Sequence, residues 1–484
     1  MTLPQVTITE LDGALGVLPP SAGRLTVFLG CCSAGPYNMP ATFARTQDLQ
    51  SNFGIGPNVE AAAFYIVNTG RPVVFIRAAV GSTAPSVGPV TMVGTGTSVI
   101  TVSAATGEPA DDYQYRLRVV NGGTVGTAGI TVQGSRDGGY TWTPVVPLGT
   151  LTEITTVTGV TFAVGPGTMV AGDVYSAEGT GPVYDSTTLQ AALTALASSA
   201  IAWEQLVLTG PIIGSLVGTI DTAINGLRAH GRYRSWIGCY RMPNAGESES
   251  AYQLAFNASF GTAVSINGGV TAGATRLVSV LDGRVFRRPL LFGFMALQGN
   301  VSEEVNVADV NLGPIPGAFI SDGNGNPLEH DESLNPGLDD NRAITARSWD
   351  GYPGVYVTRP RLLSGPTSDF QIIPYRRVMN LAEDALRMYF IRRLNRPVRV
   401  DTSTGFILEA DAVEIEAGAT ETLRAALLAK PKASGVQFVL SRVDNVLATK
   451  TLTGRARVIP LAYPEFIEIE VGFYNPALAT PAAA

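Results

Sequence analysis

Three short segments of the chain contain residue types that could do chemistry. The first is Gly30-Cys-Cys-Ser-Ala-Gly35, a glycine-bounded loop that follows an apolar run and is superficially similar to a phosphate-binding loop. Such a loop needs a lysine directly after its last glycine and a helix that opens there, so that backbone amides and an ammonium group hold the phosphate. Pro36 stands at that position here. The spacing therefore argues against nucleotide binding.

The second segment, Asp322-Gly-Asn-Gly-Asn-Pro327, is similar to the start of a calcium-binding loop. A loop of that kind requires glycine at its sixth position and a bidentate glutamate at its twelfth. The chain has Pro327 and Ser333 at these positions, which indicates an ordinary turn.

The third segment gathers carboxylates around one of the two histidines of the chain. Its residues are His330, Asp331, Glu332, Asp339 and Asp340. Such a set could coordinate a metal ion, but a chain whose only histidines are His230 and His330 cannot form a His-rich site, and solvated loop charges explain the set better. The chain also lacks GxSxG, HExxH and a matched acid–base pair. We therefore predict no catalytic residues, no metal and no cofactor.

The chain has three cysteines, Cys31, Cys32 and Cys239, and this odd, low count does not form a disulfide framework. Cys31 and Cys32 end an apolar run, where cysteines are usually buried thiols. A disulfide between subunits, or from Cys31 or Cys32 to Cys239, is the alternative. Zinc binding has no support because no CxxC spacing is present.

The composition limits the classes of partner. The 484 residues suffice for about three domains. Only 15 % of them are charged, which favours a chain that hides surface in an assembly, although a large monomer with a Ser/Thr/Asn-rich surface fits equally well. The net charge of −7 disfavours direct binding to nucleic acid. We see no signal peptide and no apolar stretch long enough to cross a membrane, so we expect a chain that folds in a cytoplasm.

The hydrophobic pattern predicts an α/β and α+β multidomain protein. Residues 21–80 and 182–368 alternate buried strands with amphipathic helices, which is typical of an α/β core with a largely parallel sheet. In this pattern we expect residues 290–296 to form a buried strand. Residues 81–181 are rich in Gly, Thr, Ser and Val and predict an inserted all-β domain, a sandwich or barrel, joined to the core by linkers.

The two ends of the chain have patterns of their own. Residues 1–20 predict an extended arm in which Val6 and Ile8 alternate with polar residues. Residues 369–475 predict a C-terminal α+β domain with helices over about 375–394 and 417–428 and three strands, the last of which spans 465–473. Residues 476–484 predict a flexible tail.

Charges in the C-terminal domain fall into two blocks. Between residues 375 and 400 seven arginines stand against two acids, and between 401 and 421 six acids stand against no base. Opposed blocks suit head-to-tail pairing between copies, although two solvated faces that partly neutralise each other explain them equally well. The interface charges expected are Arg376, Arg377, Arg387, Arg392, Arg393, Arg396, Glu409, Asp411, Glu414 and Glu416.

Several segments, taken in order, resemble the contractile tail sheath protein family, which comprises myophage tail sheaths and sheaths of related contractile injection systems. Residues 25–36 are similar to the start of a sheath core. Residues 107–113, 135–142 and 172–175 resemble the β insertion of many sheaths. Residues 331–390 resemble the junction between the core and the C-terminal domain, and residues 454–460 and 465–471 resemble the closing strands.

The resemblance implies a structural subunit that forms stacked hexameric rings around an inner tail tube. The inserted domain would lie on the outer surface and the C-terminal domain would face the tube. N- and C-terminal arms would add strands to C-terminal domains of neighbouring copies, whose acceptor strands span residues 435–459. The arm residues are Val6, Ile8, Ile467, Ile469 and Val471. Contraction would drive the tube through the target cell envelope for genome delivery.

The implied partners are the chain itself, the tail tube protein, and baseplate and tail terminator proteins, with no membrane or nucleic acid. The implied location is the virion, after assembly in the host cytoplasm. A tailocin, secretion or extracellular contractile injection system is the alternative. A more distant alternative is a surface adhesin or glycan-binding protein that stacks sugars on Tyr113, Tyr115, Tyr140 and Trp142.

Overall fold

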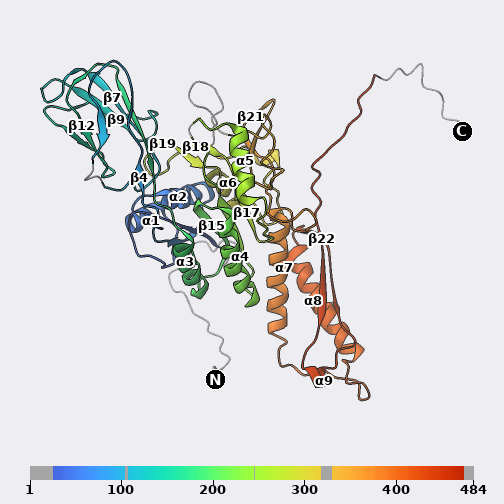
Figure 1. Cartoon of the computed structure of the whole chain (residues 1–484). Helices are drawn as coiled ribbons and strands as arrows, with labels where there is room; N and C mark the ends of the chain where they lie inside the picture. The colour runs from blue at the N-terminus through green and yellow to red at the C-terminus, as the bar shows by residue number, and fades with distance from the viewer. Residues whose placement is uncertain (1–24, 104–106, 245, 318–329, 474–484) are drawn as a thin grey trace. The chain divides into compact units, whose positions relative to one another are not determined.

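The computed structural model describes residues 25–103, 107–244, 246–317 and 330–473 (Figure 1). The predicted N-terminal arm with Val6 and Ile8 and the predicted tail 476–484 lie outside the described residues. The chain divides into two compact units, Met1–Pro397 and Val398–Ala484.

The first unit is built on a six-stranded sheet with the strand order β17-β16-β15-β1-β3-β2. The first five strands in this order run parallel, and β2 joins β3 antiparallel at one edge. The strands are β1 (Leu25–Gly30), β2 (Ala41–Phe43), β3 (Val73–Arg77), β15 (Trp203–Pro211), β16 (Ser235–Cys239) and β17 (Gly268–Thr271). Their near-continuous apolar runs are those of a sheet that is covered on both faces.

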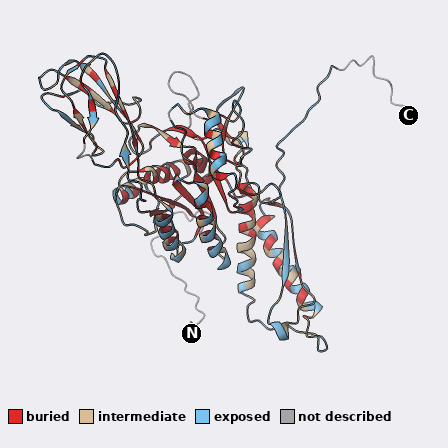
Figure 2. Cartoon of the chain, in the orientation of Figure 1, coloured by how far each residue is buried: buried red, intermediate tan, exposed pale blue. Residues whose placement is uncertain are grey.

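Helices cover both faces of this sheet. One face packs against α1 (Thr46–Phe53), α2 (Pro57–Thr69) and α6 (Leu291–Gly299). The other face packs against α3 (Ser186–Ser198), α4 (Gly214–Ala229) and α5 (Glu249–Phe260). Strand alternation sends Phe28 into the first layer and Val27 and Leu29 into the second. Figure 2 shows these buried residues as a continuous interior between the exposed outer faces of the helices.

The predicted strand at residues 290–296 is wrong, because the structure has the helix α6 there. All nine of its residues are buried. A helix that is buried on every side shows no polar face, and its short apolar run therefore has the same pattern as a buried strand.

Antiparallel strands make up the regular structure described between Ser86 and Thr180, here called the β region. One sheet has the order β10-β9-β7-β14-β4, with β5 also on β14; β11-β12-β6 and β13-β8 form two smaller sheets. The strands are β4 (Ser86–Val87), β5 (Thr91–Val93), β6 (Ile100–Val102), β7 (Tyr113–Asn121), β8 (Gly123–Thr124), β9 (Thr131–Ser135), β10 (Val146–Pro147), β11 (Glu153–Thr155), β12 (Thr161–Val164), β13 (Thr168–Met169) and β14 (Val174–Thr180).

The segments predicted as linkers of this region are paired. Strand β4 pairs with the end of β14, and the Gly81 amide donates to the carbonyl of Val183 at 2.8 Å. The two segments that connect the β region to the core, before β4 and after β14, are therefore hydrogen-bonded to each other.

The first unit continues after α6 through further elements. These are the hairpin β18 (Ala274–Val278) and β19 (Val285–Pro289), the 3-10 turn η1 (Val310–Leu312), the hairpin β20 (Ala346–Trp349) and β21 (Tyr352–Val357), and helix α7 (Ile373–Ile391). The predicted domain boundary at residue 369 is wrong, because the first unit extends to Pro397 and includes α7. The cause is a set of buried polar contacts between α7 and the core, described below.

The second unit contains α8 (Glu409–Leu427), β22 (Ala433–Leu440), the short α9 (Val446–Thr449) and β23 (Gly454–Pro460). Helix α8 begins eight residues before the predicted start at 417 and packs its apolar stripe on β22. Strands β22 and β23 pair antiparallel. Residues 465–473, predicted as a strand, form no strand in this structure. Among the described residues no helix is long and apolar enough to cross a bilayer.

Candidate functional site

The glycine-bounded loop at residues 30–35 lies at the carboxyl end of β1, beside β15. Ligands of α/β sheets usually bind where the strand order reverses, and this is that position. Here the amides of Ser33 and Ala34 donate to the carbonyls of Ile55 and Phe53 at 2.8 and 3.1 Å. Because the chain itself uses these amides, they are not available to a phosphate. The calcium-like segment 322–327 lies outside the described residues.

His330 lies in a buried network of carboxylates. Its Nδ1 and Nε2 lie 2.6 and 2.5 Å from carboxylate oxygens of Glu249 and Glu332, and its side chain is 1 % exposed. Burial by itself lowers the pKa of His330, but the hydrogen bonds to both carboxylates outweigh it and raise the pKa to about 9. The imidazolium of His330 therefore links Glu249, at the start of α5, to Glu332 of its own loop.

The prediction of solvated loop charges at this segment is wrong for most of its residues. Asp331 accepts hydrogen bonds from the hydroxyls of Ser333 and Ser348 at 2.6 Å, and buried Asp339 pairs with Arg359 and Arg361. Asp340 alone is exposed. No group of three or more His, Cys, Asp or Glu side chains suited to a metal occurs in the part of the chain that the structure describes.

The three cysteines are free and buried. Burial raises the pKa of Cys31 and Cys239 to about 12 and that of Cys32 to about 11. Thiols with such values are protonated and unreactive at neutral pH. No disulfide joins Cys31 or Cys32 to Cys239 in this structure.

A buried ion pair lies where the β region meets the core. Arg288 of β19 donates two hydrogen bonds to Asp111 at 2.8 and 2.6 Å, and the two side chains are only 3 % and 4 % exposed. Glu60 of α2 lies close to this pair and accepts a hydrogen bond from Ser279 at 3.0 Å. Burial raises the pKa of Glu60 to about 7, although the positive charge of Arg288 opposes the rise.

The hairpin β18–β19 of the core also reaches into the β region. Phe286 belongs to the apolar cluster of the β region, and its ring centroid lies 6.1 Å from that of Tyr113. The Val285 amide donates to Asp137, whose carboxylate also accepts from Thr141. The β region and the core therefore share apolar side chains as well as an ion pair.

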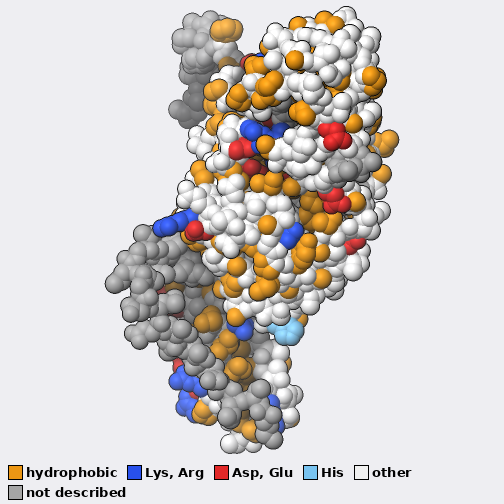
Figure 3. All heavy atoms as spheres, turned by 90° about the vertical axis from the view of Figure 1, so that its left-hand side faces the viewer, with side chains coloured by type: hydrophobic (Ala, Val, Ile, Leu, Met, Phe, Trp, Pro, Cys, Tyr) orange, Lys and Arg blue, Asp and Glu red, His pale blue; other side chains and the backbone are white. Residues whose placement is uncertain are grey.

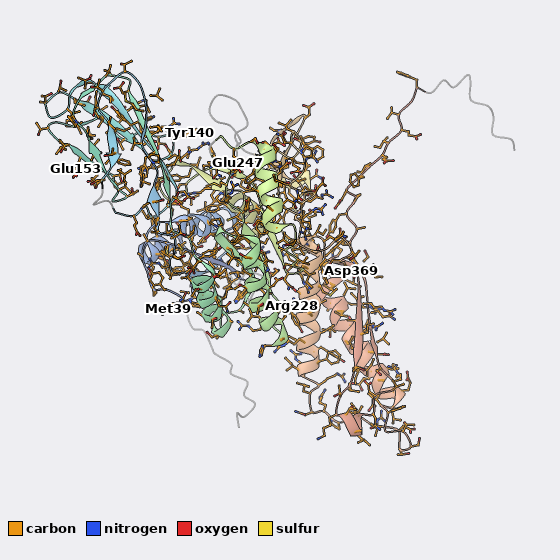
Figure 4. All side chains as sticks on the ribbon, in the orientation of Figure 1. Met39, Tyr140, Glu153, Arg228, Glu247 and Asp369 are labelled. Carbon is orange, nitrogen blue, oxygen red and sulfur yellow. The ribbon has the colours of Figure 1, made fainter. Side chains whose placement is uncertain are left out.

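Four aromatic residues had suggested sugar stacking. Tyr113 and Tyr115 are buried at 4 % and 5 % exposure. The guanidinium of Arg276 lies 4.8 Å from the ring centre of Tyr140, which Figure 4 labels, and that of Arg118 lies 4.4 Å from the Trp142 ring. Tyr113 and Tyr115 therefore serve internal contacts, whereas Tyr140 is 38 % exposed and Trp142 is half-buried.

Two of the predicted interface arginines are internal. Arg376 is 2 % exposed and bonds to Asn380 and Glu383 of its own helix α7 at 2.9 and 2.8 Å. Arg377 is 8 % exposed and bonds to Glu204 of β15 at 3.2 Å. The prediction that these two arginines face another copy is therefore wrong, because buried charges need partners within the fold.

Arg228 at the end of α4 completes this cluster. Arg228, which Figure 4 labels, bonds to Glu383 at 2.8 and 2.9 Å and to Asn380 at 2.8 Å. No local pattern marked Arg228, which lies 152 and 155 positions from Asn380 and Glu383. Arg387, Arg392 and Arg396 are exposed, and Arg393 lies over the ring of Tyr389 at 5.1 Å.

Three of the four predicted interface acids bond within the second unit. Glu409 and Glu416 both pair with Arg442, at 2.6 and 2.7 Å, and Asp411 accepts from Arg399 at 2.9 Å. Arg442 was missed because it stands outside both charge blocks. The alternative of internal neutralisation therefore accounts for these acids. The face drawn in Figure 3 carries few charged side chains among hydrophobic and neutral ones, in line with the 15 % charged content.

Large apolar side chains are exposed along the described C-terminal segment. Between residues 461 and 473 the chain forms no helix or strand. The exposed fractions are 83 % for Phe466, 74 % for Ile467, 76 % for Ile469, 91 % for Val471 and over 100 % for Phe473. Such a run on a folded chain marks an interaction segment.

Comparison with known proteins places the chain in a family. Residues 3–361 match the family described as DUF2586, N-terminal domain. No curated protein matches the sequence.

Solved structures of contractile machines have a similar fold. A chain of an extracellular contractile injection system, the PVC sheath complex in its contracted state, superposes with a TM-score of 0.52 at 11 % identity, covering 98 % of both chains. A chain of the anti-feeding prophage baseplate gives 0.51 at 9 % identity and covers 98 % of this chain and 99 % of that one. A sheath tail protein from Listeria innocua gives 0.44 at 12 % identity, with 91 % and 96 % covered. The chain belongs to the DUF2586 family and has the contractile tail sheath fold.

Proposed function

We propose that this chain is the structural subunit of a contractile tail sheath. The observation that carries the proposal is the likeness to the PVC sheath complex, which extends over 98 % of both chains rather than over one shared domain. In the proposed assembly, subunits form hexameric rings that stack helically around an inner tail tube. The subunit has a mechanical role and no catalytic one.

The proposed arrangement assigns a place to each part of the subunit. The core of residues 21–80 and 182–368 forms the wall of the sheath, and the β region within residues 81–181 lies on the outer surface. The second unit faces the tube. Residues 2–10 and 464–480 act as arms that add strands to the second units of neighbours. The exposed apolar residues between 466 and 473 support the C-terminal arm.

Contraction follows from two assembled states with a barrier between them. The extended sheath is metastable, and many weak contacts reform in a wider and shorter arrangement. Added strands keep neighbours joined during this movement, because backbone hydrogen bonds survive the rotation of rigid units. The work drives the tube through the target envelope for genome delivery. The baseplate starts assembly and a terminator protein ends it.

We place the protein in a phage virion, after assembly in the host cytoplasm, because the whole sheath subunit stands on one chain. A tailocin, secretion or extracellular injection system is the second candidate, favoured by the two injection-system structures.

Negative-stain microscopy of the purified full-length protein tests the proposal. We expect long hollow tubes with regular axial striations at micromolar concentration. A chain that stays monodisperse and monomeric through concentration and salt changes contradicts it.

A further inference from the structure

A cavity of about 510 Å³ lies between the two larger sheets of the β region, beside the core hairpin β18–β19. One wall includes Tyr115 and Tyr175 of the sheet that contains β7 and β14. The opposite wall includes Ile100 and Phe162 of the sheet β11-β12-β6. The volume lies within the range of about 300–1,000 Å³ that is usual for small-molecule sites. The cavity is therefore large enough for an organic ligand.

The part of the cavity between the sheets is mainly apolar. The hydroxyl of Tyr175 donates to the carbonyl of Ser98 at 3.0 Å, and that of Tyr115 bonds to the hydroxyl of Thr158 at 2.9 Å. Because the chain itself uses these hydroxyls, the two rings offer the cavity only their apolar surfaces. The hydrocarbon of Phe162 lies on the other side. This part of the cavity therefore suits a hydrocarbon chain.

Charged residues line the part of the cavity next to the hairpin. Guanidinium nitrogens of Arg136 and Arg284 lie 3.6 and 3.5 Å from the same carboxylate oxygen of Asp282. Both distances are longer than those of ordinary hydrogen bonds. The Nε atom of Arg136 is buried and has no hydrogen-bond partner in the part of the chain that the structure describes. A buried donor without an acceptor costs free energy, which an acceptor on a ligand would recover.

The charge balance of this end favours an anion. Arg116 of β7 adds a third guanidinium to the lining. Asp137 lies near Asp282, but its carboxylate already accepts hydrogen bonds from Ser135, Thr141 and the Val285 amide. Even with Asp137 included, three arginines stand against two carboxylates. A negatively charged ligand group is therefore attracted to this end of the cavity.

We propose that this cavity binds a single-chain amphiphile with a carboxylate head, the chemistry of a fatty acid. The hydrocarbon chain lies between the two sheets, and the carboxylate accepts hydrogen bonds from Arg136 and Arg284. A carboxylate matches the planar fork of a guanidinium group. A sugar fits the cavity less well, because the rings of Tyr115 and Phe162 leave its hydroxyls without partners. This binding site goes beyond the mechanical role proposed above and does not depend on assembly.

Calorimetric titration of the full-length protein with dodecanoate, below the concentration at which it forms micelles, tests the site. We expect a single dodecanoate to bind per chain. Dodecanol has no negative charge and should bind about tenfold more weakly, the usual effect of a hydrogen bond to a charged group. Dodecyltrimethylammonium should not bind, because its cation would lie beside Arg136 and Arg284. Equal binding of all three amphiphiles, or binding of none, overturns the proposal.

Substitutions separate recognition of the head from that of the chain. R136Q should lower the affinity for dodecanoate about tenfold and leave that for dodecanol unchanged, and R284Q repeats this test if R136Q does not fold. The control R45Q removes an exposed arginine outside the cavity lining and should change neither affinity. A177L extends a side chain of the lining and should weaken the binding of both amphiphiles, with A177V as the smaller change if A177L does not fold. If the lining variants and R45Q behave alike, the cavity is not the site.

Two further outcomes distinguish the cavity from a surface that adsorbs lipid, and the inference from the proposed function. If the protein co-sediments with phosphatidylglycerol vesicles but binds no dodecanoate, the β region contacts a membrane surface and the proposed cavity site is wrong. Tubes that form from a protein without affinity for dodecanoate overturn the inference and leave the function standing. Specific binding of dodecanoate without tubes supports the site and contradicts the function.

Discussion

At the scale of the residue, burial decides what the charged side chains do. The sequence assigned His330 to solvent and Arg376 to an interface, yet both are buried against carboxylates. Neither assignment could be corrected from the sequence, because the partners of His330 include Glu249, 81 positions away. The cysteines were easier, since their place at the end of an apolar strand already indicated burial. The local sequence pattern predicts the burial of apolar residues better than the burial of charged residues, because buried charges depend on partners that are distant in sequence.

Glu60 of α2 makes the stability of the first unit depend on pH, and the direction of the effect follows from its pKa. Burial raises its pKa from 4.5 to about 7 in the folded chain, so the folded state binds a proton that the unfolded state releases. Stability from this group is present below pH 4.5 and is lost as the pH rises through 7. The free energy of unfolding of the wild type should therefore fall by about 3 kcal/mol between pH 4.5 and 8. We expect no such fall in E60Q, because its side chain does not titrate.

Tryptophan fluorescence during urea unfolding measures this effect, because all four tryptophans lie in the first unit. The control E153Q removes an exposed carboxylate of β11 and should retain the wild-type slope. Equal pH slopes in E60Q and the wild type would refute the role of Glu60.

At the scale of the element, period and capping predicted most of the core. The predicted alternation of buried strands with helices is found in β1, α1, α2 and β3 and again from α3 to β17. The failures have physical causes. Helix α6 is buried all round and so has no amphipathic period, and α7 shows its apolar face but not the buried arginines that bind it to the core. The hairpin β18–β19 was not predicted, because its role depends on contacts with residues more than 100 positions away.

Phe286 packs the hairpin β18–β19 of the core against the β region. Its side chain is 5 % exposed and packs in the apolar cluster of the β region, so truncation leaves a cavity between two parts of the unit. We expect F286A to cost about 3–5 kcal/mol of unfolding free energy. Hydrogen exchange should rise in β7 and β14 and stay unchanged in the central strands β1 and β3.

The matched control is V278A on the same hairpin, where the side chain is 48 % exposed. It should change stability by less than about 0.5 kcal/mol. If F286A and V278A behave alike, the hairpin does not stabilise the β region.

At the scale of the whole molecule, order along the chain carried more information than any single motif. Each segment that resembled a sheath was short, but their succession over residues 25–471 agreed with the fold found. The boundary between units was predicted too early because the polar passage before α7 has the composition of a linker. Charged residues of α7 itself, Glu383 and Arg377, instead form ion pairs with Arg228 of α4 and Glu204 of β15. The chain therefore divides only after Pro397.

The arginines after α7, of which Arg392 is exposed and Arg393 is half-buried beside Tyr389, remain the candidates for contacts between copies. Arg376 and Arg377 are internal, and Glu409, Asp411 and Glu416 already have arginine partners, so simple pairing of the two blocks lacks most of its acids. We propose that Arg392 and Arg393 contact acids elsewhere on a neighbour. R392E/R393E should then keep the wild-type circular dichroism and melting temperature but reduce the polymerised fraction, because the association constant between copies falls about tenfold, or about 1.4 kcal/mol for both arginines together.

Sedimentation and negative-stain microscopy at low and high salt measure this fraction. Added salt should lower the polymerised fraction of the wild type, because exposed charges are screened beyond about 10 Å at 0.1 M salt. The difference in polymerised fraction between the wild type and R392E/R393E should therefore become smaller at high salt. The control R424E reverses the charge of an exposed arginine of α8 and should assemble normally. Normal tubes from R392E/R393E would assign these arginines to solvent.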